Sequence, residues 1–404
     1  MAKFILFPEN FLWGAATSAY QVEGGNINND WYFWGNEKKT PARCAKAVDS
    51  YNRFEEDFDL AGQLGHNAQR ISLEWSRIEP QENQFNQEEI EHYRKVLLSL
   101  KARGIKAVLT LHHFTNPLWF YRDGCWLNPS SVSRFAEYVN RVSKEFYGLA
   151  DYWITINEPL VYVYNSYLRG AWPPGEKSIS KVLAVIANMA RAHLSAYKII
   201  HNNCQNVSVS IAKHIRIFSP CQGLGLGLNA LSAYLRNQVF NYRLLEFLAK
   251  KKSLDFIGVN YYGRDFVKFS SKDFFGRDCY CSRHQLRRNS LGWYVFPEGL
   301  LKILMRLKKF NLPLMITENG TSEKEDYLYE KYLRQHLFYL ARALGQGVDI
   351  IGYLWWSLID NFEWDKGFGA KFGLIGVDRD LNRSIKPFAL AYKDICLNNK
   401  LEYA

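Results

Sequence analysis

Two segments decide the fold, AQRISLEW (residues 68–75) and IKAVLTLHH (residues 105–113), together with the residues between them. Each segment reads as a β-strand. Apolar residues between them recur at helical spacing, and we expect that helix to begin after Asn86, to use Glu89 in its cap and to end at Gly104. A strand, a helix and a second strand in this order predict a βαβ unit with parallel strands.

The same alternation continues along the whole chain of 404 residues. Helical stripes at 132–146 and 332–344 each precede a strand-like segment. The further strand candidates are FLWGAATSA (11–19), DYWITINEP (151–159), NVSVSIAKHI (206–215), LDFIGVNYY (254–262), LPLMITENG (312–320) and IIGYLWWSL (350–358). No linker or internal repeat interrupts them, so the sequence predicts an α/β fold, a single (β/α)8 TIM barrel over residues 1–404, rather than two doubly wound domains. The segment 214–254 has the least regular pattern.

The composition and the charge of the chain argue against several classes of partner. Hydrophobic residues make up 48% and charged residues 23%, as in a globular protein, and no apolar run approaches the roughly 18 residues needed to cross a membrane. The net charge is +11, but the basic residues are dispersed and match no nucleic-acid-binding motif. We expect a solvated basic surface, no nucleic acid partner and no membrane partner, and the sequence leaves the oligomeric state open.

The cysteines do not have the spacing of a zinc site. The seven cysteines lack zinc-like spacing: Cys279 and Cys281 form only a C-x-C pair, and Cys125 and Cys221 are interpreted as inert. Reduced thiols, together with an N-terminal apolar run too short for a signal peptide, predict a cytoplasmic protein.

Polar and aromatic residues gather where the predicted strands end, which is where (β/α)8 barrels place their catalytic groups. The residues at or just beyond those ends are Gln21, Glu23, Arg70, Glu74, His112, His113, Asn157, Glu158, Asn260, Tyr262, Glu318, Trp356, Asp360, Glu363 and Trp364. Neighbouring residues on a strand face opposite ways, so only one of the two histidines can enter the barrel; we expect His112 to be packed and expect no metal site. The set is rich in carboxylates and in rings that could cover the apolar face of a sugar.

Glu158 and Glu318 are the two carboxylates of greatest interest, because they close strands that lie almost opposite each other in the predicted barrel. One such residue would most simply be a surface carboxylate, but two facing one cavity indicate cleavage of a glycosidic bond. At about 5 Å and an effective dielectric near 20, two negative charges repel by roughly 3 kcal/mol, which is enough to keep one carboxyl protonated. Arg70 is the expected partner that keeps Glu318 ionised.

Seven motifs, in order along nearly the whole chain, resemble those of glycoside hydrolase family 1, the β-glucosidase and β-galactosidase family. They are FLWGAATSAYQVEGG (11–25), LEWSRIEP (73–80), TLHHFTNPLW (110–119), TINEP (155–159), LDFIGVNYY (254–262), ITENG (316–320) and GYLWWSLIDNFEWDKGFGAKFGL (352–374). The resemblance implies a (β/α)8 barrel and a retaining two-step mechanism, without a cofactor. It assigns Glu158 as the acid/base and Glu318 as the nucleophile.

The resemblance also implies which other residues contact the sugar. Arg70 and Tyr262 would hydrogen-bond the nucleophile, and Asn260 belongs to the same polar cluster. The expected substrate-binding residues are Gln21, His113, Asn157, Glu363 and Trp364, with Trp356 as a stacking floor and Phe372 lining the pocket.

Three features bear on the substrate, which we expect to be a small-molecule glycoside or an oligosaccharide. Glu363 would bind the 4-OH and 6-OH and repel a 6-phosphate, so the resemblance implies an unphosphorylated β-glucoside, β-galactoside or β-fucoside. Phe114 stands where the family usually has Trp, and Tyr329 where it commonly has Arg. The chain is expected to be shorter than its relatives around 214–254, which would open the aglycone side. Two alternatives stay open: a barrel that binds glycans with little catalysis, and a transglycosylase.

Overall fold

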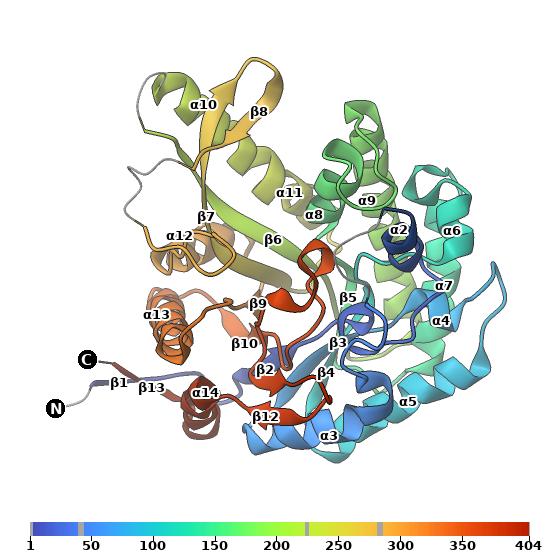
Figure 1. Cartoon of the computed structure of the whole chain (residues 1–404), viewed down its shortest axis with the longest axis horizontal. Helices are drawn as coiled ribbons and strands as arrows, with labels where there is room; N and C mark the ends of the chain where they lie inside the picture. Colours follow the sequence, from blue (N-terminus) through green and yellow to red (C-terminus); the bar gives the residue numbers. More distant parts are fainter. Residues whose placement is uncertain (1–2, 39–43, 223–225, 281–285, 404) are drawn as a thin grey trace.

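The computed structural model describes residues 3–38, 44–222, 226–280 and 286–403. In these residues eight parallel strands form a closed barrel (Figure 1), because the sheet runs in the order β6-β5-β4-β3-β2-β10-β9-β7 and β7 pairs again with β6. The barrel strands are β2 Leu12–Ala16, β3 Ala68–Ser72, β4 Lys106–His112, β5 Tyr152–Asn157, β6 Ser208–Pro220, β7 Ile257–Ser270, β9 Leu314–Asn319 and β10 Ile350–Trp356. All eight lie within the predicted segments or extend them, so the predicted (β/α)8 fold is confirmed.

Helices connect successive strands and cover the outside of the barrel (Figure 1). Their bounds are α1 Ala19–Val22, α2 Asp30–Lys38, α3 Ser50–Gln63, α4 Trp75–Ile78, α5 Gln87–Ala102, α6 Leu118–Arg122, α7 Ser131–Glu145, α8 Pro159–Val163, α9 Ile179–Asn203, α10 Leu226–Arg236, α11 Arg243–Lys250, α12 Glu298–Leu307, α13 Asp326–Gly345 and α14 Pro387–Asn398. Short 3-10 or π segments lie at Cys125–Leu127, Tyr164–Leu168, Asn237–Tyr242, Lys308–Phe310 and Trp364–Gly369. No helix in the described ranges is both long enough and apolar enough to span a bilayer.

Helix α5 begins and ends as its sequence predicts, with one difference. The Asn86 side chain accepts hydrogen bonds from the backbone N–H groups of Glu88 and Glu89, and Gly104 beyond the last turn has a φ of +69°. The Glu89 carboxylate accepts a hydrogen bond from the hydroxyl of Tyr51 instead of closing a capping box. Asn86 is therefore a one-sided cap, which still satisfies two of the free N–H groups of the first turn.

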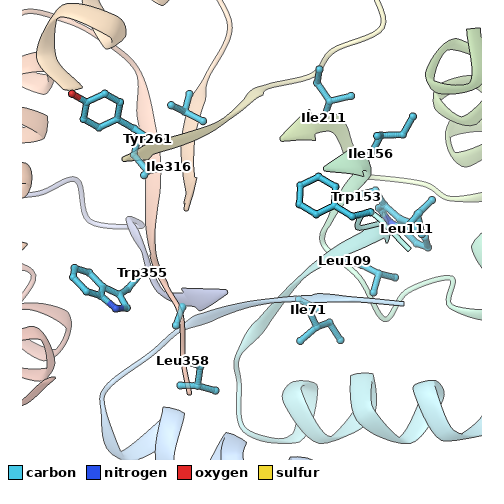
Figure 2. Close-up of a cluster of buried hydrophobic side chains, with 14 of the residues drawn as sticks. Ile71, Leu109, Leu111, Trp153, Ile156, Ile211, Tyr261, Ile316, Trp355 and Leu358 are labelled. Carbon is cyan, nitrogen blue, oxygen red and sulfur yellow. The ribbon is translucent and has the colours of Figure 1, made fainter. Parts of the chain in front are cut away.

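Side chains of alternating direction divide the core into two layers. The outer layer lies between strands and helices, and Figure 2 shows members of it such as Ile71, Leu109 and Trp153. The inner layer contains one residue from each strand, or in one case the residue just before it: Leu12, Ala68, Val108, Ile154, Ala212, Phe256, Met315 and Leu354. This inner layer fills the barrel, so polar side chains further along the same strands have a closed apolar floor beneath them.

Strands β6 and β7 continue beyond the barrel, and the segment with the irregular pattern, 214–254, holds the end of β6, then α10, the π segment Asn237–Tyr242 and α11. Strand β8, Asp273–Asp278, is antiparallel to β7, and α10 packs against β6, β7 and β8 (Figure 1). The predicted shortening of this region stays a prediction. Two further pairs lie outside the barrel: β1 Lys3–Leu6 with β13 Lys400–Tyr403, and β11 Ile375–Val377 with β12 Arg383–Ile385.

The expectation that the thiols are all reduced is wrong for one pair. Cys221 and Cys279 form a disulfide between residues 58 apart in the sequence. The pairing of β6, β7 and β8 brings them together, since the N–H groups of Cys221 and Cys279 donate to the neighbouring carbonyls of Val267 and Phe266. Cys221 is thus a structural cross-link, and Cys281 lies outside the described residues. Free, buried thiols remain at Cys44, Cys125, Cys204 and Cys396.

Candidate active site

Glu158 and Glu318 stand at the carboxyl ends of β5 and β9, and both are buried. Glu158 follows the last residue of β5 and precedes Pro159, which begins α8. Its φ of +44° places it in the left-handed region that few residues other than glycine adopt. This turn between strand and helix aims the carboxyl over the barrel instead of along the helix.

Glu318 accepts hydrogen bonds on both of its carboxylate oxygens. Arg70 Nη1 forms an ion pair with Oε1 at 2.5 Å, and the Tyr262 hydroxyl donates to Oε2 at 2.6 Å. Arg70 is fully buried, and its Nε donates to Thr110 Oγ1 at 3.0 Å. A buried anion held by a guanidinium and a phenol is well placed for nucleophilic attack.

A chain of hydrogen bonds connects Glu318 to Glu158. Arg70 Nη2 donates to Asn157 Oδ1 at 2.7 Å, and Asn260 Nδ2 donates to the same oxygen at 3.1 Å. Asn260 Nδ2 also donates to Glu158 Oε1 at 2.7 Å. The two carboxylates, Arg70, Asn157 and Asn260 therefore form one connected cluster, as their positions at the strand ends predicted.

The two carboxylates influence each other's proton affinity. Burial and the nearby Glu158 charge together raise the pKa of Glu318 to about 7, against the opposing charge of Arg70. Burial acts in the same sense on the pKa of Glu158, but His214, Asn260 and Lys213 outweigh it, so that this pKa lies below its usual value. One proton shared between two such groups belongs to the pair. Arg70 is paired with Glu318 as expected from the sequence, and the partners of Glu158 also influence where the proton resides.

His214 is the residue near the carboxylates that the sequence reasoning missed. Its Nδ1 lies 3.1 Å from Glu158 Oε1, and its ring stacks on Tyr262 at 5.8 Å. Alternation along β6 could have found it: Ala212 belongs to the inner layer, so the residue two positions on also faces inward.

His113 enters the site and His112 does not, as predicted. His113 Nε2 accepts from Asn157 Nδ2 at 3.1 Å, so Nδ1 carries the proton. Nδ1 is buried and has no partner among the described residues, and burial lowers the pKa of this imidazole well below its usual value, which keeps it neutral. His112 bonds Asn116 Oδ1 at 3.0 Å and packs edge-on against Trp126.

The predicted aromatic residues surround this cluster. Trp356 stacks on His113 at 5.9 Å and belongs to one apolar group with Tyr262 and Phe372. Trp364 is nearly parallel to His113 and also contacts Phe114, with ring centroids 6.1 and 5.1 Å apart. Trp355 faces the outer layer, as expected from alternation along β10.

Gln21 and Glu363 lie together on the other side of the aromatic group. Gln21 Nε2 donates to the Phe362 carbonyl at 2.7 Å and lies 3.3 Å from Glu363 Oε2. Burial, together with the smaller effect of the Glu318 charge, raises the pKa of Glu363 to about 8. The loop is braced by Asp360, which accepts from Lys386 Nζ at 2.8 Å.

Glu23 and Glu74 are used for structure. Glu23 accepts from Tyr93 and Arg77, and Glu74 accepts from Ser76 and Thr115. Within the described ranges, no three His, Cys, Asp or Glu side chains are arranged to hold a metal ion.

Comparisons with known proteins find relatives that match nearly the whole chain. The model of glycosyl hydrolase family 1 matches residues 4–224 and 229–401. A solved beta-glycosidase from Pyrococcus horikoshii is 34% identical, with a TM-score of 0.93 over 99% of this chain and 97% of that one. The beta-glucosidase from Thermotoga maritima in complex with glucoimidazole, a sugar-like inhibitor, is 28% identical, with a TM-score of 0.91 over 98% and 99% of the two chains.

A relative with a different activity in its name also matches. The galactolipid galactosyltransferase SFR2, chloroplastic, of Arabidopsis thaliana is 31% identical over 371 residues, which cover 86% of this chain and 57% of that protein.

Proposed function

The chain belongs to glycosyl hydrolase family 1 and is a retaining β-glycosidase, and we propose that it removes terminal non-reducing β-D-glucosyl, galactosyl or fucosyl residues from unphosphorylated glycosides. Glu318 is the nucleophile and Glu158 the acid/base. The observation that carries this proposal is the hydrogen-bonded connection of the two buried carboxylates through Arg70, Asn157 and Asn260.

In the first step Glu318 attacks the anomeric carbon while Glu158 gives its proton to the leaving oxygen. Arg70 and Tyr262 hold Glu318 by both oxygens, so it approaches in a defined orientation. The bond to the leaving oxygen breaks as the glycosyl-enzyme ester forms.

In the second step Glu318 carries no charge, because its carboxylate has become an ester. The repulsion that Glu158 experienced is then absent, so its carboxylate form is favoured and takes a proton from the incoming water. Water attacks the anomeric carbon from the face the leaving group left, and the product has the same configuration as the substrate.

Side chains around the carboxylates are suited to a pyranose. The unpartnered Nδ1–H of His113 can donate to a sugar hydroxyl, Asn157 is proposed to bind the 2-OH, and Trp356 offers a ring face. The carboxyl of Glu363 can exchange hydrogen bonds with the 4-OH and 6-OH, and its ionised form would repel a phosphate.

Turnover of nitrophenyl β-D-glucoside, galactoside and fucoside tests the proposal. NMR of the first product from the wild-type protein should show the β-anomer. Glu318→Ala should abolish release of nitrophenol, whereas Glu88→Ala, an exposed carboxylate on α5, should leave it unchanged. Turnover retained in folded Glu318→Ala, or a first product of α configuration, would refute the assignment.

A second candidate function is transfer of the glycosyl group to a hydroxyl other than water. The similarity to the protein named galactolipid galactosyltransferase favours it. The test is to add glycerol, or a galactoside with free hydroxyls, to the nitrophenyl glycoside reaction and compare nitrophenol with free sugar. A deficit of free sugar that grows with the acceptor supports transfer, and equal amounts at every acceptor concentration exclude it.

A further inference from the structure

The structure assigns a positioning role to His214 of β6: through its Nδ1–H it holds Oε1 of Glu158, so that Oε2 carries the proton exchanged with the substrate. This inference rests on the proposed role of Glu158 as the acid/base. It extends that role, because nothing in the family motifs identified above includes His214.

The hydrogen bonds of the carboxyl group define which oxygen is free. Oε1 of Glu158 accepts from Asn260 Nδ2 at 2.7 Å and lies 3.1 Å from His214 Nδ1. No hydrogen bond from the described part of the chain reaches Oε2. An oxygen that already accepts from an amide is a poor place for the transferable proton. The proton therefore resides on Oε2 in the first step and returns to Oε2 from water in the second.

The position of His214 is fixed by its surroundings. It is buried, with its ring stacked on Tyr262 at 5.8 Å and edge-on to Phe240 at 6.0 Å. Lys213, the preceding residue, is fully buried, donates from Nζ to the His214 carbonyl at 2.5 Å, and lies over the Phe240 ring at 4.6 Å. The ring can thus turn only slightly, so its Nδ1 stays directed at Glu158.

The charged and titratable groups around this pair come from several elements. On β6 they are Lys213 and Arg216, and Arg216 is paired with Asp265 of β7 at 2.7 Å. The others are Tyr262 on β7, Glu318 on β9 and Glu363 after β10. Arg70 on β3 and His113 after β4 both bond Asn157, which is connected to Glu158 through Asn260. Of these titratable groups, His214 contacts Glu158 directly. Removal of His214 should therefore change the pKa of Glu158 more than that of the other groups.

A donor at Oε1 favours the ionised form of Glu158. Because this lowers the pKa of Glu158, its protonated form is a stronger acid. Cleavage of a glycoside with a poor leaving group, which needs the proton most, should depend on His214 more than cleavage of an activated one.

His214→Phe and His214→Asn separate position from charge. Phe keeps a ring against Tyr262 and Phe240 without a donor, whereas Asn keeps a donor that cannot become charged. In His214→Phe the basic limb of the kcat/KM profile should move up by about one pH unit, the effect expected for loss of a hydrogen bond to a charged group. Its rate on methyl β-D-glucoside should fall at least about tenfold more than on nitrophenyl β-D-glucoside, and His214→Asn should restore most of that difference.

The matched control is His92→Phe, because His92 of α5 also stacks on a tyrosine, Tyr51, far from the carboxylates. It should leave both limbs of the profile unchanged. Equal losses on the two substrates with an unmoved basic limb, in a variant that keeps the wild-type Tm, would overturn the inference. If His214→Phe does not fold, His214→Leu, which also lacks a donor, must move the limb upward, and an unmoved limb there has the same consequence.

A measurement without turnover distinguishes this inference from the proposed function. The infrared difference between the wild type and Glu158→Gln isolates the carboxyl band of Glu158. That band should titrate at higher pH when the same difference is taken in the His214→Phe background, even if no glycoside tested is hydrolysed. An unchanged titration refutes the role of His214, whereas absent hydrolysis refutes only the proposed function.

Discussion

Tyr262→Phe should move the acidic limb of the kcat/KM profile to higher pH. The Tyr262 hydroxyl donates to Glu318 Oε2 at 2.6 Å, and this hydrogen bond lowers the pKa of Glu318 against the larger effect of burial. Without the donor, the ionised nucleophile loses stabilisation that the protonated form never had. A larger fraction of the protein then has a protonated, inactive Glu318 at any pH near neutrality.

The magnitude follows from the kind of hydrogen bond. A bond to a charged group contributes about 1.5–3 kcal/mol, which corresponds to a shift of about one to two pH units. On the acidic limb kcat/KM is proportional to the fraction of ionised Glu318, so at a fixed pH on that limb it should fall about 10- to 100-fold. The loss should be smaller at higher pH, up to the basic limb. The ring contacts of Tyr262 with His214, Trp293 and Phe372 do not involve the hydroxyl and should persist.

The assay is hydrolysis of a nitrophenyl β-glycoside from pH 4 to pH 9 at constant ionic strength. Tyr261→Phe is the matched control: this neighbouring hydroxyl donates to the Phe296 carbonyl at 2.6 Å, so its loss should lower Tm without moving either limb. The reasoning is wrong if Tyr262→Phe folds normally and its acidic limb coincides with that of the wild type. In that case the limb reports a group other than Glu318.

Three further predictions concern stability. Asn86→Ala should lower the free energy of unfolding by about 1 kcal/mol, since it removes the cap of α5, and calorimetry should detect this at unchanged kcat; an unchanged Tm contradicts it. The pKa of Glu363 is raised by burial to about 8 from 4.5, so its contribution to stability is fully present below pH 4.5 and is lost as the pH rises through 8. Glu363→Gln should therefore gain Tm relative to the wild type between pH 5 and pH 9, and a parallel pair of Tm–pH curves would disprove this. Cys221→Ser should lower stability by up to about 4 kcal/mol, because the disulfide closes a loop of 58 residues; the reduced wild type should match it in Tm, and no change on reduction would count against the cross-link.

Local pattern predicted the elements well. The strand segments and the helix at 87–102 follow from periods of two and of about 3.6 residues, and a period needs only a few neighbouring residues to be expressed. The same reasoning separated His113 from His112 and Trp356 from Trp355, because alternation along a strand decides which of two neighbours enters the barrel. It would also have found His214, had the alternation been followed along β6.

The sequence by itself determined an eight-stranded barrel and placed Glu158 and Glu318 at the ends of two of its strands. Only the tertiary structure decided which groups control their protons. Arg70 contacts Glu318 across 248 residues and Asn157 across 87, His214 meets Glu158 across 56, and Cys221 meets Cys279 where β6, β7 and β8 pair. Which residues become partners depends on how the barrel closes and on the register of its strands, and both depend on packing along the whole chain. A helix or strand, in contrast, is specified by residues close in sequence.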